Sequence, residues 1–235
     1  RVYDDWQDET FDFDPELVSA TREEFAWQMR HVKSRFTPIS FFDVSEFLEF
    51  GKPLPKRPIS VTFDDGYEDN FTHAFPILRD LGMPATIFLA TGYLGGQATF
   101  WYDWLYHLCR HASRQGTRVE FGGRDVRFPN DFAGFYDRYV DLISFAKRMP
   151  DPAMRAEIAK LEHTLGINSP AHGFAASRPL TWEQVREMAA NGIEFGSHTV
   201  THPVLSNLTG DTLAGELSTS KVDIERQIDR KVTTI

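Results

Sequence analysis

The chain opens with two stretches in which apolar residues recur about once per helical turn after a capping pair. Thr21 with Glu24 forms the first pair and predicts a helix that follows it. Asp43 with Glu46 forms the second pair and predicts a short helix, which Gly51 and the proline-rich residues 52–58 end. Two helices are therefore expected before the first strand.

The next segment alternates between strand and helix patterns. Residues 59–63 are a short run with β-branched members, which predicts a buried strand that leads into a turn. Asn70 is the predicted cap of a helix that reaches about Leu81, and residues 84–90 predict a second strand. The order strand, helix, strand is typical of a parallel α/β unit.

The pattern changes from residue 95 to about residue 178. An aromatic helical stretch covers residues 100–108, a hairpin is predicted over 118–128, and an amphipathic helix follows over 154–165. We interpret residues 95–178 as a mostly helical insertion.

Beyond the insertion the α/β alternation resumes. A capping-box helix begins after Thr181, a short strand is predicted over residues 193–195, and a last amphipathic helix follows Thr209. We therefore predict a single domain over residues 1–235 that carries the insertion at about 95–178.

Composition narrows the classes of function. The chain is 41% hydrophobic, which is enough for a sizeable core and too much for intrinsic disorder. Its net charge of −9 gives no general attraction for phosphate backbones, so nucleic-acid binding is not expected. No apolar run approaches the roughly 20 residues that span a bilayer, and the first residues lack a signal-peptide pattern, so we expect the chain as given to be soluble.

Two polar clusters stand directly after predicted strands. Asp64 and Asp65 precede Gly66, and His198 and His202 follow the strand at 193–195. In a parallel sheet or barrel all strand ends open on one face, so the two clusters can meet. Two imidazoles spaced in this way share one side of a helical turn, and a carboxylate from the neighbouring strand end completes a metal-ligand set. Because a structural site is closed by four ligands, three ligands favour a catalytic metal.

The paired aspartates need separate roles. Both can reach one site only if the strand breaks at the pair, which Gly66 permits. One carboxylate would bind the metal and the other would accept a proton from water, whose pKa zinc can lower to about 7. This chemistry is metal-assisted hydrolysis. Zinc is the default cation for such ligands, and cobalt, nickel, manganese and iron stay open.

Each motif alone has a simpler interpretation. An Asp-Gly pair after a strand is first a turn, and two histidines often share a surface turn without a metal. Only the two motifs together, at equivalent strand ends, favour a site. His107 and His111 repeat the histidine spacing on the aromatic stretch, where we expect a solvated or partly packed face. Trp101, Tyr102 and Trp104 beside them are expected in the core.

The residues TFDDG at 62–66 and SHTVTHP at 197–203 resemble the first two motifs of the NodB-type polysaccharide deacetylases, carbohydrate esterase family 4. The likeness covers roughly residues 53–95 and 178–230, and the stretch between them is similar to the insertion of some bacterial members associated with exopolysaccharide synthesis. The resemblance implies an α/β fold with a deformed (β/α) barrel, here incomplete, and a divalent metal, most commonly zinc.

By this resemblance, Asp65, His198 and His202 bind the metal. Asp64 is then the general base, and Thr199 supports the loop between the histidines by hydrogen bonding. The substrate would be an acetylated polysaccharide or oligosaccharide, and the reaction would remove acetyl groups from N-acetylated sugars. The location stays open, with the bacterial cytoplasm and the cell envelope as the two candidates.

The sequence departs from the family at its end. The third family motif, which donates a backbone N–H to the oxyanion, would follow Ile235, and the later motif that supplies the general acid is absent too. We therefore expect the metal half of the site without the acid half. Four alternatives stay open: a metal-retaining carbohydrate-binding protein, an esterase for O-acetylated xylan, an Fe(II)-dependent oxygenase with the same ligand triad, and a fragment inert outside its longer parent.

Overall fold

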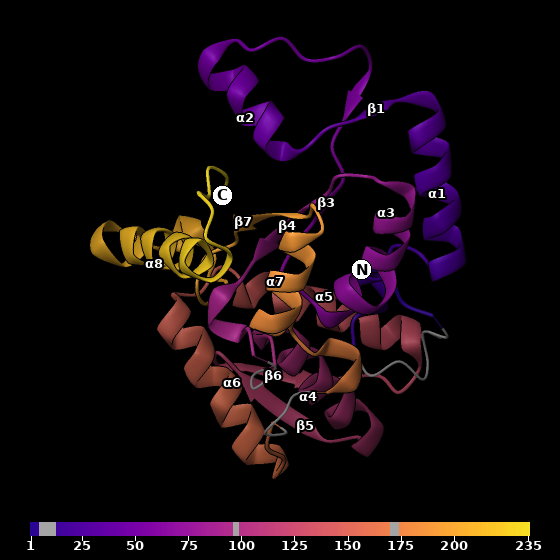
Figure 1. Cartoon of the computed structure of the whole chain (residues 1–235). Helices are drawn as coiled ribbons and strands as arrows, with labels where there is room; N and C mark the ends of the chain where they lie inside the picture. The colour runs from indigo at the N-terminus through magenta and orange to yellow at the C-terminus, as the bar shows by residue number, and fades with distance from the viewer. Residues whose placement is uncertain (5–12, 96–98, 170–173) are drawn as a thin grey trace.

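The computed structural model describes residues 1–4, 13–95, 99–169 and 174–235. At its centre lies a parallel sheet of three short strands (Figure 1). In spatial order the strands are β3 (Thr62–Phe63), β4 (Thr86–Leu89) and β7 (Glu194–Ser197). The parallel α/β arrangement is as expected, and within the described residues the sheet stays open and does not close into a barrel.

Helices from both ends of the chain pack around this sheet. They are α1 (Arg22–Arg35), α3 (Phe75–Leu81), α7 (Trp182–Ala190) and α8 (Gly210–Ile228). One buried cluster joins them to the strands, with Phe25 of α1, Leu78 of α3, Met188 of α7 and Ile224 of α8 all almost inaccessible to solvent. The predicted capping boxes at Thr21 and Thr181 are confirmed at the starts of α1 and α7.

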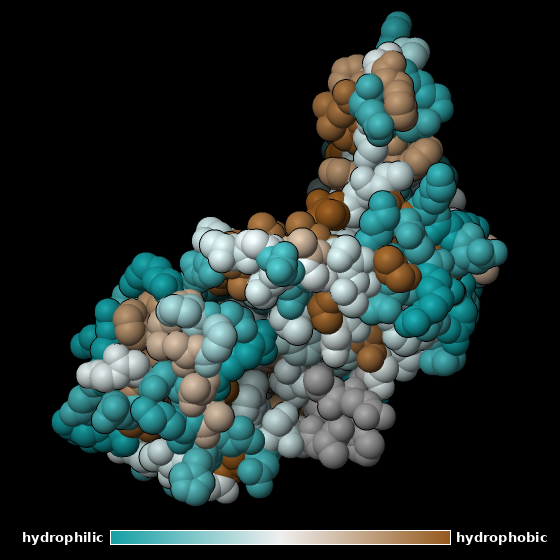
Figure 2. Space-filling view, turned by 90° about the vertical axis from the view of Figure 1, so that its left-hand side faces the viewer, coloured by the Kyte–Doolittle hydropathy of each residue, from teal (hydrophilic) through white to brown (hydrophobic). Residues whose placement is uncertain are grey.

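An arm projects from this body (Figures 1 and 2). It consists of β1 (Thr37–Pro38), α2 (Phe41–Phe50) and β2 (Pro58–Ile59). The prediction that the helix begins at Asp43 was wrong: Ser40 caps the helix, and its hydroxyl accepts from the Asp43 N–H while the Asp43 carboxylate accepts from the Ser40 N–H. The predicted strand over 59–63 is divided, because residues 58–59 pair with β1 of the arm and residues 62–63 pair with β4.

The helix between β3 and β4 also differs from its prediction. Asn70 does not cap it; residues 70–74 form a π-helical turn, in which the Phe75 N–H donates to the Asn70 carbonyl. Pro76 explains the wider turn, because proline lacks an N–H and its ring would clash with a carbonyl four residues earlier in a regular α-helix. The helix ends at Gly82 as expected, in the left-handed conformation with φ of 58°.

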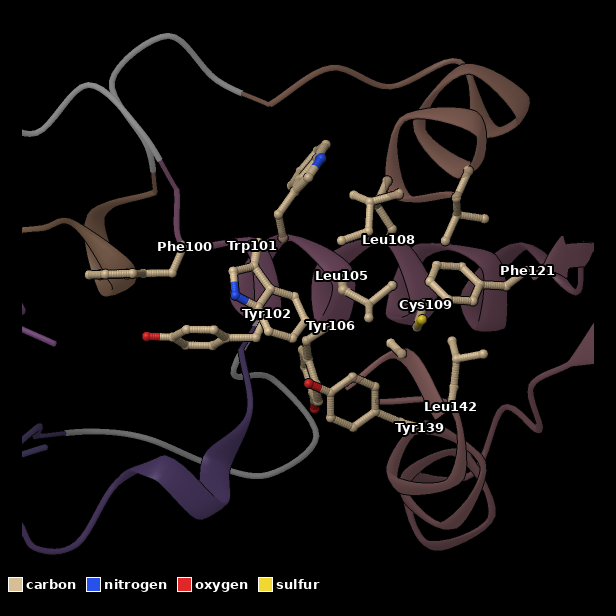
Figure 3. Packing of buried hydrophobic residues seen from close by; sticks show 14 of the residues in the cluster. Phe100, Trp101, Tyr102, Leu105, Tyr106, Leu108, Cys109, Phe121, Tyr139 and Leu142 are labelled. Atoms are coloured by element: carbon tan, nitrogen blue, oxygen red, sulfur yellow. The ribbon is translucent and has the colours of Figure 1, made fainter. Parts of the chain in front are cut away.

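The insertion forms a second layer with its own core (Figure 3). Its elements are α4 (Trp101–Gln115), β5 (Arg118–Phe121), β6 (Arg124–Arg127), α5 (Phe132–Ala146) and α6 (Asp151–Leu165). The predicted hairpin and the helices at either end are confirmed. Helix α5 was not predicted, although Asp131 caps it by accepting from the Gly134 N–H.

Short helical turns connect the larger elements. They are Pro15–Leu17, Thr91–Tyr93, Ala175–Ser177 and Leu205–Asn207. The turn at Thr91–Tyr93 follows the middle strand directly, and Tyr93 belongs to the insertion's aromatic core. The core of the insertion therefore reaches the carboxyl end of the central sheet.

Candidate metal centre

The first polar cluster lies where β3 breaks. Asp64 directly follows the strand and is exposed, whereas the Asp65 side chain is 16% exposed. Asp65 has a φ of 71° and Gly66 a φ of 84°, so the chain turns sharply at the pair. A Cβ on Gly66 would lie 2.6 Å from a methyl carbon of Leu89, so a glycine is needed here for close approach as well as for its conformation.

The second cluster lies on an irregular loop after β7. The His198 N–H still donates to the Leu89 carbonyl at 2.9 Å, and the chain then leaves the sheet. The expectation that the two histidines share a helical turn was wrong. Thr199 and His202 adopt left-handed φ values of 70° and 52°, so the backbone between the histidines is not helical. The Thr199 hydroxyl accepts from the His202 N–H at 3.1 Å, and this bond spans the loop.

The two clusters come from strands that are not neighbours, since β4 lies between β3 and β7. The prediction of a neighbouring strand end was therefore wrong, and the loops instead meet over the end of β4. The Ala90 N–H donates to the Asp65 carbonyl at 3.2 Å, and the Thr91 N–H donates to the Thr199 carbonyl at 3.0 Å. A Cβ on Gly92 would lie 2.7 Å from the Val200 carbonyl oxygen, so this backbone is as close to the loop as a glycine allows.

This arrangement brings three side chains together at one point. Asp65 Oδ1 lies 3.4 Å from His198 Nε2 and 3.1 Å from His202 Nε2. All three ligand atoms lie within 4.8 Å of one another, and no other group of three metal-ligating side chains does so in the described part of the chain. Ligands about 2.1 Å from a tetrahedral zinc would stand roughly 3.4 Å apart, so the donor set fits such an ion.

Electrostatic interactions favour an ionised carboxylate at this point. Burial alone would raise the pKa of Asp65, but hydrogen bonding and charge attraction from His202, together with the Tyr102 hydroxyl and His198, lower it below its ordinary value. Burial lowers the pKa of His198, against the opposing attraction of Asp65. A neutral imidazole beside a carboxylate is the protonation state that a metal ligand needs.

The loop between the histidines is held from two sides. From α8, the Glu216 carboxylate accepts from the Val200 N–H at 2.7 Å and the Thr201 N–H at 2.9 Å, and from the Thr201 hydroxyl at 2.7 Å. On the other side, the Thr201 carbonyl accepts from the Arg155 guanidinium at 2.9 Å and from the Tyr93 hydroxyl at 3.1 Å.

Trp101 completes this second side, because its indole N–H donates to the His202 carbonyl at 3.0 Å. Sequence reasoning missed the supporting roles of Glu216, Arg155, Tyr93 and Trp101. The sequence pattern around Glu216 and the pattern around Arg155 indicate only that each residue lies on a helix. The expectation that Trp101 lies in the core is confirmed, since it is 5% exposed.

A buried polar chain lies behind Asp65. The Tyr67 hydroxyl is 2.8 Å from Asp103 Oδ2 and 3.2 Å from the Tyr102 hydroxyl, and the Tyr102 hydroxyl helps to lower the pKa of Asp65. The Tyr102 ring also lies 5.1 Å from the His202 ring. Burial raises the pKa of the Asp103 carboxyl to about 7, although Arg1 and the Tyr67 hydrogen bond oppose this shift.

The other pair of histidines is part of the packing of the insertion. His107 stacks on Trp104 with ring centroids 5.4 Å apart and lies 4.5 Å from the Phe174 ring. Neither His107 nor His111 belongs to a group of three metal-ligating side chains among the described residues. At His107 the structure therefore confirms the expectation of a partly packed face.

Asp64 and Asp65 both border an open cavity. A cavity of about 410 Å³ is lined by both aspartates of the first cluster and by polar residues of the neighbouring segments, including Gln28, Thr62 and Asn70. Charge attraction between Asp64 and His198 acts on the pKa of the imidazole. Asp64 is thus placed near the ligands and toward the solvent.

This geometry agrees with what known proteins show. The family model described as polysaccharide deacetylase matches residues 51–235, which include all three ligands. The chain belongs to the polysaccharide deacetylase family. Membership favours the deacetylase interpretation over that of an Fe(II)-dependent oxygenase, which left Asp64 without a role.

Individual relatives of this chain are also named as deacetylases. A poly-β-1,6-N-acetyl-D-glucosamine N-deacetylase of Escherichia coli is 41% identical over 68 residues, and one of Staphylococcus epidermidis is 26% identical over 191 residues. These matches cover 29% and 76% of this chain. The chain spans 10% of the length of the first relative and 60% of the second.

Among solved structures, a Streptococcus pyogenes deacetylase in complex with acetate superimposes with a TM-score of 0.57 at 17% identity. The likeness covers 98% of this chain and 67% of the other. The fold is therefore that of the NodB-type deacetylases. No helix in the described ranges has the length and apolar character needed to cross a membrane.

Proposed function

We propose that this chain carries the metal-binding half of a polysaccharide N-deacetylase. The convergence of Asp65, His198 and His202 supports this proposal most, because three ligand atoms from two distant segments stand at the separation that a cation needs. The substrate is an acetylated polysaccharide, and the relatives' names point to β-1,6-linked N-acetylglucosamine. Zinc is the preferred cation for this donor set, with cobalt, nickel, manganese or iron as alternatives.

A cation held there would polarise the acetyl carbonyl and make water a stronger nucleophile. Asp65, His198 and His202 hold the cation, and the Thr199 hydroxyl fixes the loop between the two imidazoles. Asp64 acts as the general base, because its exposed carboxylate lies beside the ligands without being one of them. It takes a proton from the attacking water. The acetyl C–N bond then breaks as the leaving nitrogen takes up a proton from a general acid not assigned among these residues, which releases acetate and a free amine.

The test combines metal binding with acetate release. Zinc affinity of the 235-residue chain is measured by titration, and acetate release from a β-1,6-linked N-acetylglucosamine oligomer is measured on the same chain. Asp64→Asn is expected to keep zinc affinity within a few-fold and to lose most acetate release. Asp65→Asn is expected to lose both.

Two results would contradict parts of this proposal. Acetate release that survives Asp64→Asn removes Asp64 from the role of base. Zinc and glycan binding without acetate release would instead favour the metal-retaining carbohydrate-binding protein.

A further inference from the structure

Two buried serine hydroxyls meet where the loop that carries the histidines begins. Ser197 is the last residue of β7, and Ser220 lies on α8, which packs beside that strand (Figure 1). Their side-chain oxygens are hydrogen-bonded to each other, and both residues are 0% exposed. A hydroxyl shut off from water is costly unless it has hydrogen-bond partners, so the bonds of this pair can be followed one by one.

The hydrogen bonds around the two serines run in one direction. The Ser220 hydroxyl donates to the Leu217 carbonyl at 3.1 Å, one turn earlier on α8. Because a hydroxyl carries one proton, Ser220 accepts in its bond with Ser197, and the Ser197 hydroxyl is the donor. The Ser197 oxygen in turn accepts from the Thr199 N–H at 3.2 Å. The order of donation therefore leads from the loop to the helix.

Thr199 is the residue that these bonds hold. It has a φ of 70°, which is unusual for a side chain branched at Cβ, and such a conformation persists only where the surroundings fix it. Its N–H donates to Ser197, and its carbonyl accepts from the Thr91 N–H at 3.0 Å. Its hydroxyl accepts from the His202 N–H at 3.1 Å. Thr199 thus joins the serine pair to one of the three candidate ligands.

The serine pair extends the support that α8 gives through Glu216. Glu216 and Ser220 lie four positions apart, so they share one face of the helix. The Glu216 carboxylate accepts from the Val200 and Thr201 N–H groups, and the serine bonded to Ser220 accepts from the Thr199 N–H. Three consecutive N–H groups of the loop are therefore satisfied by α8 or by a side chain that α8 holds.

We infer that Ser220 is a positioning residue for the metal centre, and that it acts through Ser197 and Thr199 on the candidate ligand His202. The inference rests on the proposed function. Without the Ser220 oxygen, the buried Ser197 proton needs another acceptor, and the hydroxyl turns away from its alignment with the Thr199 N–H. Groups that orient metal ligands without binding the metal themselves typically change metal affinity about 10- to 100-fold when they are lost. Ser220 acts through two intermediates, so a smaller factor is expected.

The experiment compares zinc and cobalt affinity of the wild-type chain with that of alanine variants. Ser220→Ala removes only the hydroxyl and is expected to weaken affinity about 3- to 10-fold. Ser197→Ala removes the acceptor of the Thr199 N–H itself and is expected to weaken affinity about 10-fold or more. In the double variant, the loss of Ser220 is expected to add less than about two-fold, because Ser220 acts only through Ser197.

Ser218→Ala is the matched control on the same helix. The Ser218 hydroxyl is exposed and donates to the Ala214 carbonyl at 2.7 Å, so its removal is expected to leave affinity unchanged. The absorption spectrum of bound cobalt is a second measurement, because a change of ligand geometry alters it and a loss of stability alone does not. Thermal unfolding without metal shows which variants fold.

The outcomes separate this inference from the proposed function. Wild-type affinity and an unaltered cobalt spectrum in Ser220→Ala overturn the inference and leave the metal centre standing. Full additivity of the two losses in the double variant also overturns it, because Ser220 would then act by another route. A wild-type chain that binds neither cation overturns both the inference and the proposed function.

The inference stays testable if one variant does not fold. Without a folded Ser197→Ala, Ser220→Ala decides alone: weaker binding with an altered spectrum supports the inference. Without a folded Ser220→Ala, Ser197→Ala decides, since unchanged affinity there removes the route from Ser220 to the ligand and overturns the inference. Weaker binding with an altered spectrum in Ser197→Ala supports it.

Discussion

The α/β part and the insertion support the same loop in opposite ways. From the α/β side, one carboxylate of α8 accepts the N–H groups of Val200 and Thr201. From the insertion side and the turn after β4, donors satisfy the carbonyl groups of Thr201 and His202. A loop with this backbone has few hydrogen bonds of its own, so each side supplies what the other does not. Residues of the predicted insertion thus support the loop that carries two of the three candidate ligands.

The hydrogen bonds from the α/β side are expected to contribute more to stability and zinc binding than those from the insertion side. Glu216→Ala leaves two backbone N–H groups and one hydroxyl without their acceptor, and charge-assisted hydrogen bonds are the stronger kind. We expect a loss of about 3 kcal/mol in the free energy of unfolding, together with weaker zinc binding. Chemical denaturation of the metal-free chain and zinc titration measure the two effects. The control on the same helix, Asp223→Ala, breaks a surface pair with Arg226 and is expected to change little.

The insertion side is tested by Arg155→Ala. The guanidinium donates to the Thr201 carbonyl at 2.9 Å and is oriented by Asp151 at 2.8 Å. Because it is half buried, we expect a loss of about 1 to 2 kcal/mol in unfolding free energy and a few-fold weaker zinc affinity. Lys160→Ala removes a solvent-exposed ion pair from the same helix, and both measurements are expected to stay at wild-type values. If Arg155→Ala and Lys160→Ala changed unfolding free energy and zinc affinity equally, the contact between Arg155 and the loop would not be what supports the site.

The smallest expected effect is a dependence of stability on pH. Because burial raises the pKa of Asp103 from 3.8 to about 7, the folded chain keeps a proton there that the unfolded chain has lost. Stability from this group is therefore present at low pH and is lost as pH rises through about 7. Between pH 6 and pH 8 the loss is about 1 kcal/mol.

Asp103→Asn removes this slope. The difference in melting temperature between wild type and Asp103→Asn, measured without metal, should fall from pH 6 to pH 8. Groups whose charge reaches Asp103 include Arg1, Asp14 and Asp65, and all three are unchanged in the variant. A difference that stays constant over this range would show that Asp103 does not titrate there.

Local signals in the sequence were enough for much of the fold. Capping pairs act within one turn, and those that begin at Thr21 and Thr181 marked helix starts correctly. The pair at Asp43 did not, because Ser40 caps that helix. Other failures came where distant contacts decide. The run at residues 59–63 is one strand by its pattern, yet its two ends pair with different partners.

For the candidate site, the sequence was enough to predict which side chains meet. Asp65, His198 and His202 could be named as candidates because strand ends in a parallel sheet share a face, and the structure brings their side chains together. The loop geometry at Thr199 could not be read from the spacing, since an i, i+4 pair fits a helix equally well. Glu216 was missed because its partners are backbone atoms, which leave no trace in the pattern of side chains.

The backbone of this loop has a consequence for attempts to make the chain more heat-resistant. Of the non-glycine residues with positive φ in the described ranges, Asp65, Thr199 and His202 belong to this centre. The left-handed backbone conformation costs a non-glycine residue roughly 1 kcal/mol or more. A screen that scores only survival at high temperature would reward replacements that relax these positions, and would enrich stable proteins in which the three candidate ligands no longer meet.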